Sequence, residues 1–505
     1  MERAVAILQQ DIYDQRLRAL VAPPRWQNPK PADRYNLVVI GGGTAGLVAA
    51  AGAAGLGGKV ALVERELLGG DCLNYGCVPS KALLRAAKAV AEARRGPEFG
   101  LHLPADLRPD FAALMQRMRR LRADIAVHDS AERFQKLGVD VFLGVARFTG
   151  RDTVEVDGVR LRFSRALIAT GGRPVELDVP GIQETGYRTN LDLFTLTELP
   201  RRLVVVGAGP IGCEMAQAFA LFGSQVTVIT HDRKVLPRED PEASAIVKKA
   251  MEASGVRFEL DGKLERAERR GRDRIVIWKR GEETHETPCD EILLATGRRP
   301  NIENLGLDQA GVQTDQRGVV VDEYLRSSNS RIYASGDVAG KWQFTHAADA
   351  MSRLVLRNAL FFGRAKVSAL TIPWCTYTHP EAAHVGLYQH DANETGLDLE
   401  EIRIPFEDVD RAVLDGDAEG FAKAIIDKKT GRLRGATVVA AHAGEILGEA
   451  CLAVTQRQKV GALSSIIHPY PTQVSVWGRI GDEGMRRKLT PTAAKVLRKI
   501  LEWRR

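Results

Sequence analysis

The chain contains one glycine pattern twice, and each copy follows a short apolar segment that we expect to be a strand. In the first copy, the strand 35–40 leads into Gly41-Gly42-Gly43-Thr44-Ala45-Gly46, a helix of small residues follows, and the strand 60–63 ends at Glu64. This order is typical of a dinucleotide site, because the glycines bring the backbone and a helix N-terminus close to a pyrophosphate. We expect Glu64 to bind a ribose diol. The glycines expected to hold the pyrophosphate are Gly41, Gly43 and Gly46.

In the second copy, the strand 203–206 precedes Gly207-Ala208-Gly209-Pro210-Ile211-Gly212, a helix runs to Phe222, and the next strand covers 225–229. One ligand needs only one pyrophosphate site, so two copies indicate two different dinucleotides. Where an NAD site has its acidic residue, this copy has Thr230-His231-Asp232-Arg233. Basic groups there suit a 2′-phosphate, so we expect NADPH rather than NADH. The residues expected to hold it are Gly207, Gly209, Gly212, Thr230, His231 and Arg233.

Length and composition fit a large globular protein. A chain of 505 residues is long enough for about three domains, and its 44% hydrophobic content supplies a large core. No apolar run is long enough to span a bilayer. Charged residues at Glu2, Arg3 and Asp11 lie within the most apolar part of the N-terminus, which argues against a signal peptide. The six cysteines are too few for a disulfide scaffold in a chain of this length, so we expect a cytoplasmic protein.

The net charge of +7 belongs to the C-terminal tail. Residues 485–505 contain eight Lys and Arg against Glu502 alone, which accounts for the whole net charge. The rest of the chain is near neutral, so we expect no nucleic-acid partner. Thr490-Pro491 predicts a helix start, and the apolar residues of this helix lie mostly on one side: Val496, Leu497, Ile500, Leu501 and Trp503. The tail is predicted either to contact an anionic membrane surface peripherally or to dock on the body with its charges in water.

Two cysteines, Cys72 and Cys77, lie close together between Gly69-Gly70 and an expected helix over 82–93. A helix N-terminus lowers the pKa of a nearby thiol and favours the nucleophilic thiolate. A structural disulfide would require an oxidising compartment, for which the sequence gives no sign. A zinc site is disfavoured because no second pair of ligands follows at the required spacing, so we expect no metal site. The pair is therefore predicted to be redox-active.

The segment CLNYGCVPSK, which starts at Cys72, resembles the redox-active disulfide of the flavin-dependent pyridine nucleotide-disulfide oxidoreductases. This family includes dihydrolipoamide dehydrogenase, glutathione reductase and mercuric reductase. The resemblance covers residues 35–480 and implies an α/β fold, with two Rossmann-like domains for FAD and NAD(P) and a C-terminal α+β dimerisation domain. It also implies a homodimer that shares its active site across the interface. The expected segments are an N-terminal extension 1–34, an FAD domain 35–175 and 300–368, an NAD(P) domain 176–299, a dimerisation domain 369–482 and a basic amphipathic tail 483–505.

The resemblance assigns roles residue by residue. Cys77 is the thiol next to the flavin, and Cys72 is the distal thiol that exchanges with a small-molecule acceptor. Lys81 lies near the flavin and pairs with Glu214. Asp337, in a Gly-Asp segment, binds the ribityl chain, and electrons pass from the nicotinamide through the flavin and the disulfide to the acceptor. The remaining expected cofactor residues are Gly70, Ala146, Thr170, Gly171, His346 and Ala347 for FAD and Gly297 for the nicotinamide nucleotide; His346 is alternatively an ordinary surface or capping residue.

The sequence departs from this family at the acid–base pair. Disulfide reductases carry a His-Pro-Thr-x-x-Glu segment, but here Tyr470 takes the place of the histidine and Ser475 that of the glutamate. A tyrosine with a pKa of about 10 is a poor base at neutral pH. His468 is expected either to substitute as the base or only to pack in the interface. Asp71, where relatives have threonine, is expected to cap a helix; facing Cys72, it would instead raise the pKa of that thiol.

The acceptor is left open by the sequence. Mercuric reductase also has a tyrosine at the position of Tyr470, but its C-terminal cysteine pair and its N-terminal Cys-x-x-Cys domain have no counterpart here. Mercuric reductase and dihydrolipoamide dehydrogenase are therefore alternatives to an oxidoreductase with an unidentified acceptor. A further alternative is a flavin redox sensor at a membrane surface.

Overall fold

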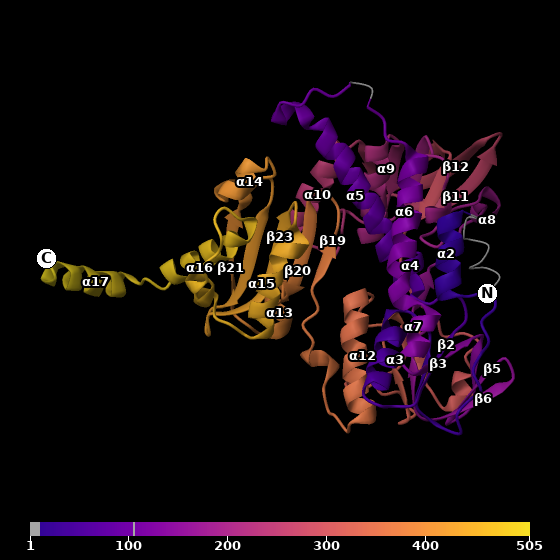
Figure 1. Cartoon of the computed structure of the whole chain (residues 1–505). Helices are drawn as coiled ribbons and strands as arrows, with labels where there is room; N and C mark the ends of the chain where they lie inside the picture. Colours follow the sequence, from indigo (N-terminus) through magenta and orange to yellow (C-terminus); the bar gives the residue numbers. More distant parts are fainter. Residues whose placement is uncertain (1–10, 105–106) are drawn as a thin grey trace. The chain divides into compact units, whose positions relative to one another are not determined.

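A computed structural model of the chain describes residues 11–104 and 107–505 (Figure 1). The chain forms two compact units. The first comprises the residues up to Arg233 together with 255–370, and the second comprises 234–254 and 371–505. Within the described ranges, no helix is long and apolar enough to cross a membrane.

A seven-stranded sheet with β1 near its centre forms one half of the first unit. The expected strand 35–40 is confirmed as β1 (Tyr35–Ile40), which pairs in parallel with β2 (Val60–Glu64) and β6 (Val159–Ile168). The sheet order is β3-β2-β1-β6-β5-β4, and β18 joins β6 in parallel, so a late segment of the chain returns to the first sheet. The remaining strands are β3 (Val139–Leu143), β4 (Ala146–Gly150), β5 (Thr153–Val156) and β18 (Ile332–Ala334).

Small residues in α3 (Thr44–Gly55) allow another helix to pack closely against it. α3 and α12 (Thr345–Leu360) lie side by side (Figure 1). A Cβ on Gly52 would lie 2.5 Å from Cδ1 of Leu356, so a larger side chain there would push the two helices apart. Both helices contribute to the core that also covers β1 and β2. This packing brings the N-terminus of α12 to the glycine turn that precedes α3.

The second glycine pattern lies on a four-stranded parallel sheet of order β10-β9-β8-β14. α9 (Pro210–Phe222) follows the second strand-turn pattern, as predicted, and is almost entirely buried. An antiparallel sheet of order β11-β12-β13 follows β10 in the chain. The strands are β8 (Arg202–Val206), β9 (Gln225–Ile229), β10 (Val256–Glu259), β11 (Lys263–Arg270), β12 (Asp273–Arg280), β13 (Glu283–Cys289) and β14 (Glu291–Leu294). Shorter elements of this unit are α8 (Ile182–Thr185), α11 (Leu307–Ala310), β7 (Gly172–Pro174), β15 (Arg298–Pro300), β16 (Thr314–Asp315) and β17 (Gly318–Val319).

The N-terminal segment is part of the first unit's core. Residues 1–10 of the predicted N-terminal helix lie outside the described residues, and the helix is confirmed from Ile12 as α2 (Ile12–Val21). Asp14 of α2 forms a buried ion pair of 2.6 Å with Arg122 of α6 (Phe111–Ile125). Arg122 also donates to the carbonyl of Asn74 at 2.8 Å. Asn74 is the last residue of α4 (Gly70–Asn74), so α2 and α6 support the helix that carries Cys72; α5 (Cys77–Arg94) and α7 (Ala131–Lys136) complete this group.

The second unit is a five-stranded antiparallel sheet of order β19-β20-β23-β22-β21 with α15 (Ala443–Thr455) packed on it (Figure 1). Trp477 of α16 (Val476–Arg486) is fully buried and donates to the carbonyl of Ile446 at 2.8 Å, which ties α16 to α15. The last helix, α17 (Pro491–Trp503), begins as predicted with Thr490 as its N-cap, and it has no buried residue. The other elements are α10 (Pro241–Ala253), β19 (Trp374–Thr376), β20 (Glu381–Gly386), α13 (Ala392–Thr395), β21 (Leu399–Pro405), α14 (Asp410–Leu414), β22 (Phe421–Asp427) and β23 (Arg432–Ala440).

Candidate active site

The two cysteines lie on two successive helices, α4 and α5. Cys72 lies in the first turn of α4, and Cys77 is the first residue of α5. Both thiols are free. The Cys77 sulfur lies 3.3 Å from the hydroxyl of Thr345, the first residue of α12. Cys77 is thus placed at the positive ends of two helices, and Thr345 is a contact that the sequence analysis did not assign.

The environment separates the pKa values of the two thiols. The pKa of Cys77 falls from 9 to about 6, because the Cys72 thiol donates a hydrogen bond to it and because Thr345 and Lys81 add to this effect against the opposing effect of burial. The pKa of Cys72 rises, because that thiol donates to Cys77 and is buried. In the reduced protein at neutral pH the negative charge therefore resides on Cys77.

Lys81 and Glu214 come together from α5 and α9. The ammonium of Lys81 lies 2.8 Å from Oε2 of Glu214, whose side chain is only 5% exposed. A carboxylate buried to this degree requires a partner charge, and Lys81 provides it one helical turn from Cys77.

The first glycine pattern forms a tight turn in which side chains would not fit. Gly41 has a φ of 107°, and a Cβ there would clash with the carbonyl oxygen of Ala169. Gly43 and Gly70 approach so closely that a Cβ on Gly70 would lie 2.6 Å from Cα of Gly43. Glu64 at the end of β2 accepts from the amide of Gly42 at 2.6 Å, which holds the turn open. An all-glycine turn that leads into the N-terminus of α3 fits the pyrophosphate of a dinucleotide, and we name it the first cradle.

A buried arginine connects the cysteine helix to the Gly-Asp segment. Arg298, whose side chain is 12% exposed, lies 3.3 Å from Oδ2 of Asp71 and 3.3 Å from Oδ2 of Asp337. Asp71 also accepts from the side-chain amide of Asn190 at 3.0 Å. The prediction that Asp71 caps a helix is wrong, because the N-cap of α4 is Gly69 and the carboxylate turns instead to the buried guanidinium. Arg298 is missing from the residues predicted from sequence, although it directly follows Gly297.

The other residues expected to bind FAD differ in exposure and in the contacts that they make. The Thr170 hydroxyl donates to the carbonyl of Asn301 at 2.6 Å. Gly171 adopts a positive φ of 66°. His346 is exposed, and its ring stacks on Phe344. Two further predicted residues are buried: Ala347 in α12 and Ala146 at the start of β4.

The second glycine pattern forms a similar tight turn, which we name the second cradle. A Cβ on Gly207 would lie 2.6 Å from the carbonyl oxygen of Ala295, and one on Gly212 would clash with the carbonyl oxygen of Gly207, whereas nothing lies within 4 Å of a Cβ on Gly209. Gly297 adopts a positive φ of 119°.

Beyond β9 the predicted nucleotide residues differ in exposure. Thr230 is buried and donates its hydroxyl proton to Asp232 at 3.0 Å. The side chains of His231 and Arg233 are 83% and 92% exposed. Asp232 is therefore engaged with Thr230, and the two basic side chains at this edge face solvent.

In the second unit, His468 is paired with a glutamate that the sequence analysis did not find. Nε2 of His468 lies 2.8 Å from Oε2 of Glu449 on α15. Both side chains are largely enclosed, and Nδ1 of His468 lies 3.6 Å from where a Cβ of Gly478 would be. Ser475 in the expected glutamate position donates to the carbonyl of Thr472 at 2.6 Å. The His-Pro-Thr-x-x-Glu pattern could not have found Glu449, because Glu449 lies 19 residues before His468, on α15.

Tyr470 is 80% exposed. Its hydroxyl donates to Oδ2 of Asp410 at 2.9 Å. This hydrogen bond raises the pKa of Tyr470 above its ordinary value, because the neighbouring carboxylate disfavours the phenolate. The phenol is therefore a weaker acid than an isolated tyrosine, and even less of it is deprotonated to act as a base at neutral pH.

Residues 35–352 match the family model of the pyridine nucleotide-disulphide oxidoreductases, and residues 372–479 match the dimerisation domain of that family. The first match covers more than half of the chain. The chain belongs to the class I pyridine nucleotide-disulfide oxidoreductases. Members of this family are oxidoreductases that use FAD and NAD(P)H, so the predicted family and α/β fold class are confirmed.

Within the pyridine nucleotide-disulfide oxidoreductases, the chain resembles enzymes with different acceptors. It is 36% identical to the mercuric reductase of Bacillus cereus over 439 residues, which cover 87% of this chain and 69% of that protein. It is 33% identical to the dihydrolipoyl dehydrogenase of Chlamydia muridarum over 457 residues, covering 88% and 96%. The Cu(II) complex of the HOCl-induced flavoprotein disulfide reductase RclA from Escherichia coli is similar in structure, with a TM-score of 0.79, 28% identity and coverage of 90% and 100%.

Proposed function

We propose that the protein moves electrons from NAD(P)H through Cys72 and Cys77 to a small-molecule acceptor. The observation that carries this proposal is the position of Cys77. Its sulfur lies at the N-termini of α5 and α12, 3.3 Å from the hydroxyl of Thr345. The pKa of Cys77 is lowered to about 6, mainly by the hydrogen bond from the Cys72 thiol and to a smaller extent by Thr345 and Lys81. A buried structural cysteine has no need of such an environment, whereas a thiol that must carry negative charge during turnover requires it.

Both cradles fit the cofactors of the family. The first cradle would hold FAD, with Gly41, Gly43 and Gly46 at the pyrophosphate and Asp337 at the ribityl chain. Glu64 keeps oxygen lone pairs for a ribose diol, since each oxygen accepts only one backbone amide, from Gly42 and Glu66. When bound, FAD supplies a redox centre that accepts a hydride and passes electrons on singly or in pairs. Lys81 and Glu214 would fix a charge pair close to Cys77.

We assign NADPH to the second cradle in preference to NADH. Asp232 is held by Thr230, while His231 and Arg233 present basic groups at the end of β9. A 2′-phosphate would find the guanidinium of Arg233 there, whose carboxylate neighbour Asp261 lies 3.5 Å away, and the exposed ring of His231 beside it.

The thiols themselves perform a balanced two-electron step. With a disulfide acceptor, the deprotonated Cys72 sulfur attacks one acceptor sulfur, and the other acceptor sulfur leaves and is protonated to a thiol. The Cys77 thiolate then attacks the Cys72 sulfur of the mixed disulfide and releases the second acceptor sulfur, which is protonated in turn. One internal disulfide forms, one acceptor disulfide is broken, and two acceptor thiols are released. This route needs a group that deprotonates Cys72, whose pKa is raised by its hydrogen bond to Cys77 and by burial. His468 is the predicted base for dithiol chemistry, as in dihydrolipoamide oxidation, but its Nε2 is engaged by Glu449.

A thiophilic metal ion is the second candidate acceptor. The exposed Tyr470 with its raised pKa favours this class, because a metal ion needs two sulfur ligands but no acid–base group to protonate a leaving thiol. Oxidation of the Cys72 thiol and the Cys77 thiolate to a disulfide releases one proton and two electrons, which suffice to reduce one Hg(II) to Hg(0) or two Cu(II) to Cu(I). The relatives named mercuric reductase and the Cu(II) complex of RclA support this acceptor class.

We also propose that the protein is a homodimer with a shared active site, which the dimerisation domain at residues 372–479 supports. An acceptor at Cys72 would then meet the segment 467–475 of the second subunit. Ile467 and Tyr470 are 96% and 80% exposed, as residues of an interface are in an isolated subunit.

For the tail we propose peripheral contact with an anionic membrane. The apolar residues of α17 are exposed, Trp503 by 86%, and they lie among basic residues with Glu502 as the one acid of the helix. This combination matches an anionic lipid surface in both polarity and charge. Deleting residues 490–505 should abolish sedimentation with anionic vesicles, and Trp503→Phe should remove a fluorescence blue shift on binding. Equal sedimentation of the full-length and shortened chains would reject the membrane contact.

An acceptor screen tests the redox proposal. The purified FAD protein is reduced anaerobically with NADPH or NADH and then offered disulfides, lipoamide, Hg(II), Cu(II) or quinones. We expect turnover that is lost in Cys72→Ser and Cys77→Ser, with NADPH preferred. Flavin that NAD(P)H does not reduce would favour the redox sensor, and turnover that survives both substitutions would overturn the thiol relay.

A further inference from the structure

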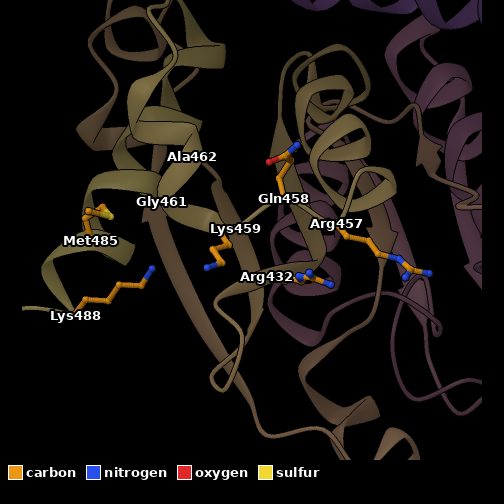
Figure 2. Close-up of a pocket in the computed structure, with 8 residues that line it drawn as sticks. All are labelled: Arg432, Arg457, Gln458, Lys459, Gly461, Ala462, Met485 and Lys488. Atoms are coloured by element: carbon orange, nitrogen blue, oxygen red, sulfur yellow. The ribbon is translucent and has the colours of Figure 1, made fainter.

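The second unit contains a basic pocket that none of the roles proposed above uses. It lies between the end of α15, the short helix η8 (Val460–Ser465), the start of β23 and the end of α16, and its volume is about 460 Å³ (Figure 2). Half of the lining residues are cationic and none is acidic. The cationic residues are Arg432, Arg457, Lys459 and Lys488.

These cations are not neutralised by the protein. In the part of the chain that the structure describes, none of the four side chains takes part in an ion pair. Elsewhere in the same unit, cations are matched closely: Lys423 lies within 4 Å of the carboxylates of Asp240, Glu242 and Glu401. The pocket therefore concentrates positive charge in a concave site, where the field is stronger than on a flat surface.

The lysines converge on the pocket from separate segments. Figure 2 shows the side chains of Lys459 and Lys488 directed toward each other across it. Glycines leave room for this arrangement: a Cβ on Gly431 would lie 3.5 Å from Nζ of Lys488, and one on Gly461 would lie 2.6 Å from the sulfur of Met485. Two ammonium groups that face each other repel, unless an anion lies between them.

Arg457 reaches the pocket lining from a turn that directly follows α15. Arg457 follows α15 with a φ of 53°, in the left-handed region. Its amide and that of Gln458 close the helix end on the carbonyls of Val454 and Ala453. Glycine is the residue that this position favours, and a longer side chain there is strained. This strain is not specific to the pocket, since Leu236, Leu325 and Phe362 also adopt a positive φ, so Arg457 enters the argument through its charge in the pocket lining.

We propose that this pocket binds a phosphate-bearing anion with at least two negative charges. Arg432 and Arg457 offer planar guanidinium groups that bind two oxygens of one phosphate, and Lys459 and Lys488 offer point charges for a second phosphate or a terminal oxygen. A volume of about 460 Å³ accepts a diphosphate or a headgroup that carries more than one phosphate. The ligand is either a soluble phosphate compound or a phospholipid headgroup. Lys488 lies two residues before the N-cap of α17, so a helix that contacts a membrane would bring the pocket near lipid headgroups.

Pyrophosphate is the probe for this site. Calorimetric titration uses the full-length FAD protein with saturating NADP⁺ and NAD⁺, so that both cradles are filled. We expect one site per chain whose affinity falls as salt is raised. The double variant Lys459→Gln/Lys488→Gln should weaken binding at least tenfold. Lys428→Gln is the matched control, because Lys428 is a surface lysine of the same unit that is paired with Asp398 at 2.8 Å, and it should leave binding unchanged.

Arg457→Gly separates ligand binding from folding. It removes both the strained backbone and the guanidinium, so the melting temperature should rise by a few degrees while pyrophosphate affinity falls at least fivefold. If the role of Arg457 were purely structural, the substitution would change the melting temperature and the pyrophosphate affinity in the same direction. Absence of a pyrophosphate site at low salt, or equal affinity of the wild type, the double variant and Arg457→Gly, would overturn the proposal.

Vesicles distinguish the source of the phosphate. If the double variant also weakens binding of the full-length chain to vesicles that contain a phosphoinositide, the ligand is a headgroup. If vesicle binding is unchanged while pyrophosphate binding is lost, the ligand is a soluble phosphate compound. The pyrophosphate result does not depend on α17 or on the redox reaction, so failure of either of those proposals leaves it standing.

Discussion

His468 and Glu449 form a histidine–glutamate pair of 2.8 Å between the segment that precedes α16 and the middle of α15. The pair joins two elements of the second unit and lies in an enclosed position, with the histidine side chain 10% exposed. It is therefore different in construction from a pair within one His-Pro-Thr-x-x-Glu segment, where both residues lie close together in the sequence. A pair between α15 and the irregular segment before α16 suits a role in fixing that segment.

We predict that His468→Gln acts on stability and leaves the chemistry unchanged. Loss of the charge-assisted hydrogen bond to a largely buried carboxylate should cost about 2–3 kcal/mol, measured by urea unfolding of the holoenzyme. The pH profile of turnover with a metal-ion acceptor should not change. A selective loss of turnover with disulfides, together with a shifted pH profile, would instead assign His468 as their acid–base group. Tyr470→Phe serves as the control on the exposed neighbour, and it should change stability by less than about 0.5 kcal/mol.

We predict that serine at position 72 preserves the low pKa of Cys77, whereas alanine at position 72 does not. In Cys72→Ser the hydroxyl can still donate to Cys77, so the pKa of Cys77 should stay at about 6. The thiolate should then form as the pH rises through that value. In Cys72→Ala the donor is lost and the pKa of Cys77 should move upward toward 9. Ultraviolet absorbance of the thiolate during a pH titration measures both. Identical titrations of the two variants would contradict the assigned hydrogen bond.

Asp71 is predicted to lower the reduction potential of the Cys72–Cys77 disulfide. Its carboxylate raises the pKa of both Cys72 and Cys77, so it disfavours the reduced form, in which a thiolate is present. Removing the charge in Asp71→Asn should raise the potential by roughly 10–30 mV, measured against a glutathione redox buffer. Glu132→Gln, which removes an exposed carboxylate paired with Lys136, should leave it unchanged. A lower potential in Asp71→Asn would reverse the assigned sign.

The N-terminal segment should be required for stability through one buried ion pair. Asp14→Asn leaves the guanidinium of Arg122 without its carboxylate in a buried site, which should cost about 3–5 kcal/mol in unfolding free energy. Asp124→Asn is the matched control, because Asp124 joins the same two helices through an exposed pair with Arg16 at 2.6 Å, and it should cost less than about 1 kcal/mol. Equal losses in both variants would show that burial does not decide the energy of these pairs.

Local order along the chain was sufficient to predict the nucleotide folds. The strand at Tyr35–Ile40, the strand at Gln225–Ile229 and the helix that ends at Phe222 lie where the sequence placed them. The reason is that strand, glycine turn and helix are adjacent in sequence, and that the backbone conformation at Gly41 and Gly207 excludes most other residues. The helix start at Thr490 was predictable for the same reason, since a cap is a contact between near neighbours.

Contacts across the chain were decided only by the tertiary structure. Arg298 meets Asp71 and Asp337, Thr345 meets Cys77, and Glu449 meets His468, although each pair is separated in sequence by residues that carry no sign of the contact. The sequence therefore determined which residue types are present and which backbone turns they form. Folding decided which charges become buried together, because the need to neutralise a buried group is satisfied by whichever partner the packing brings near.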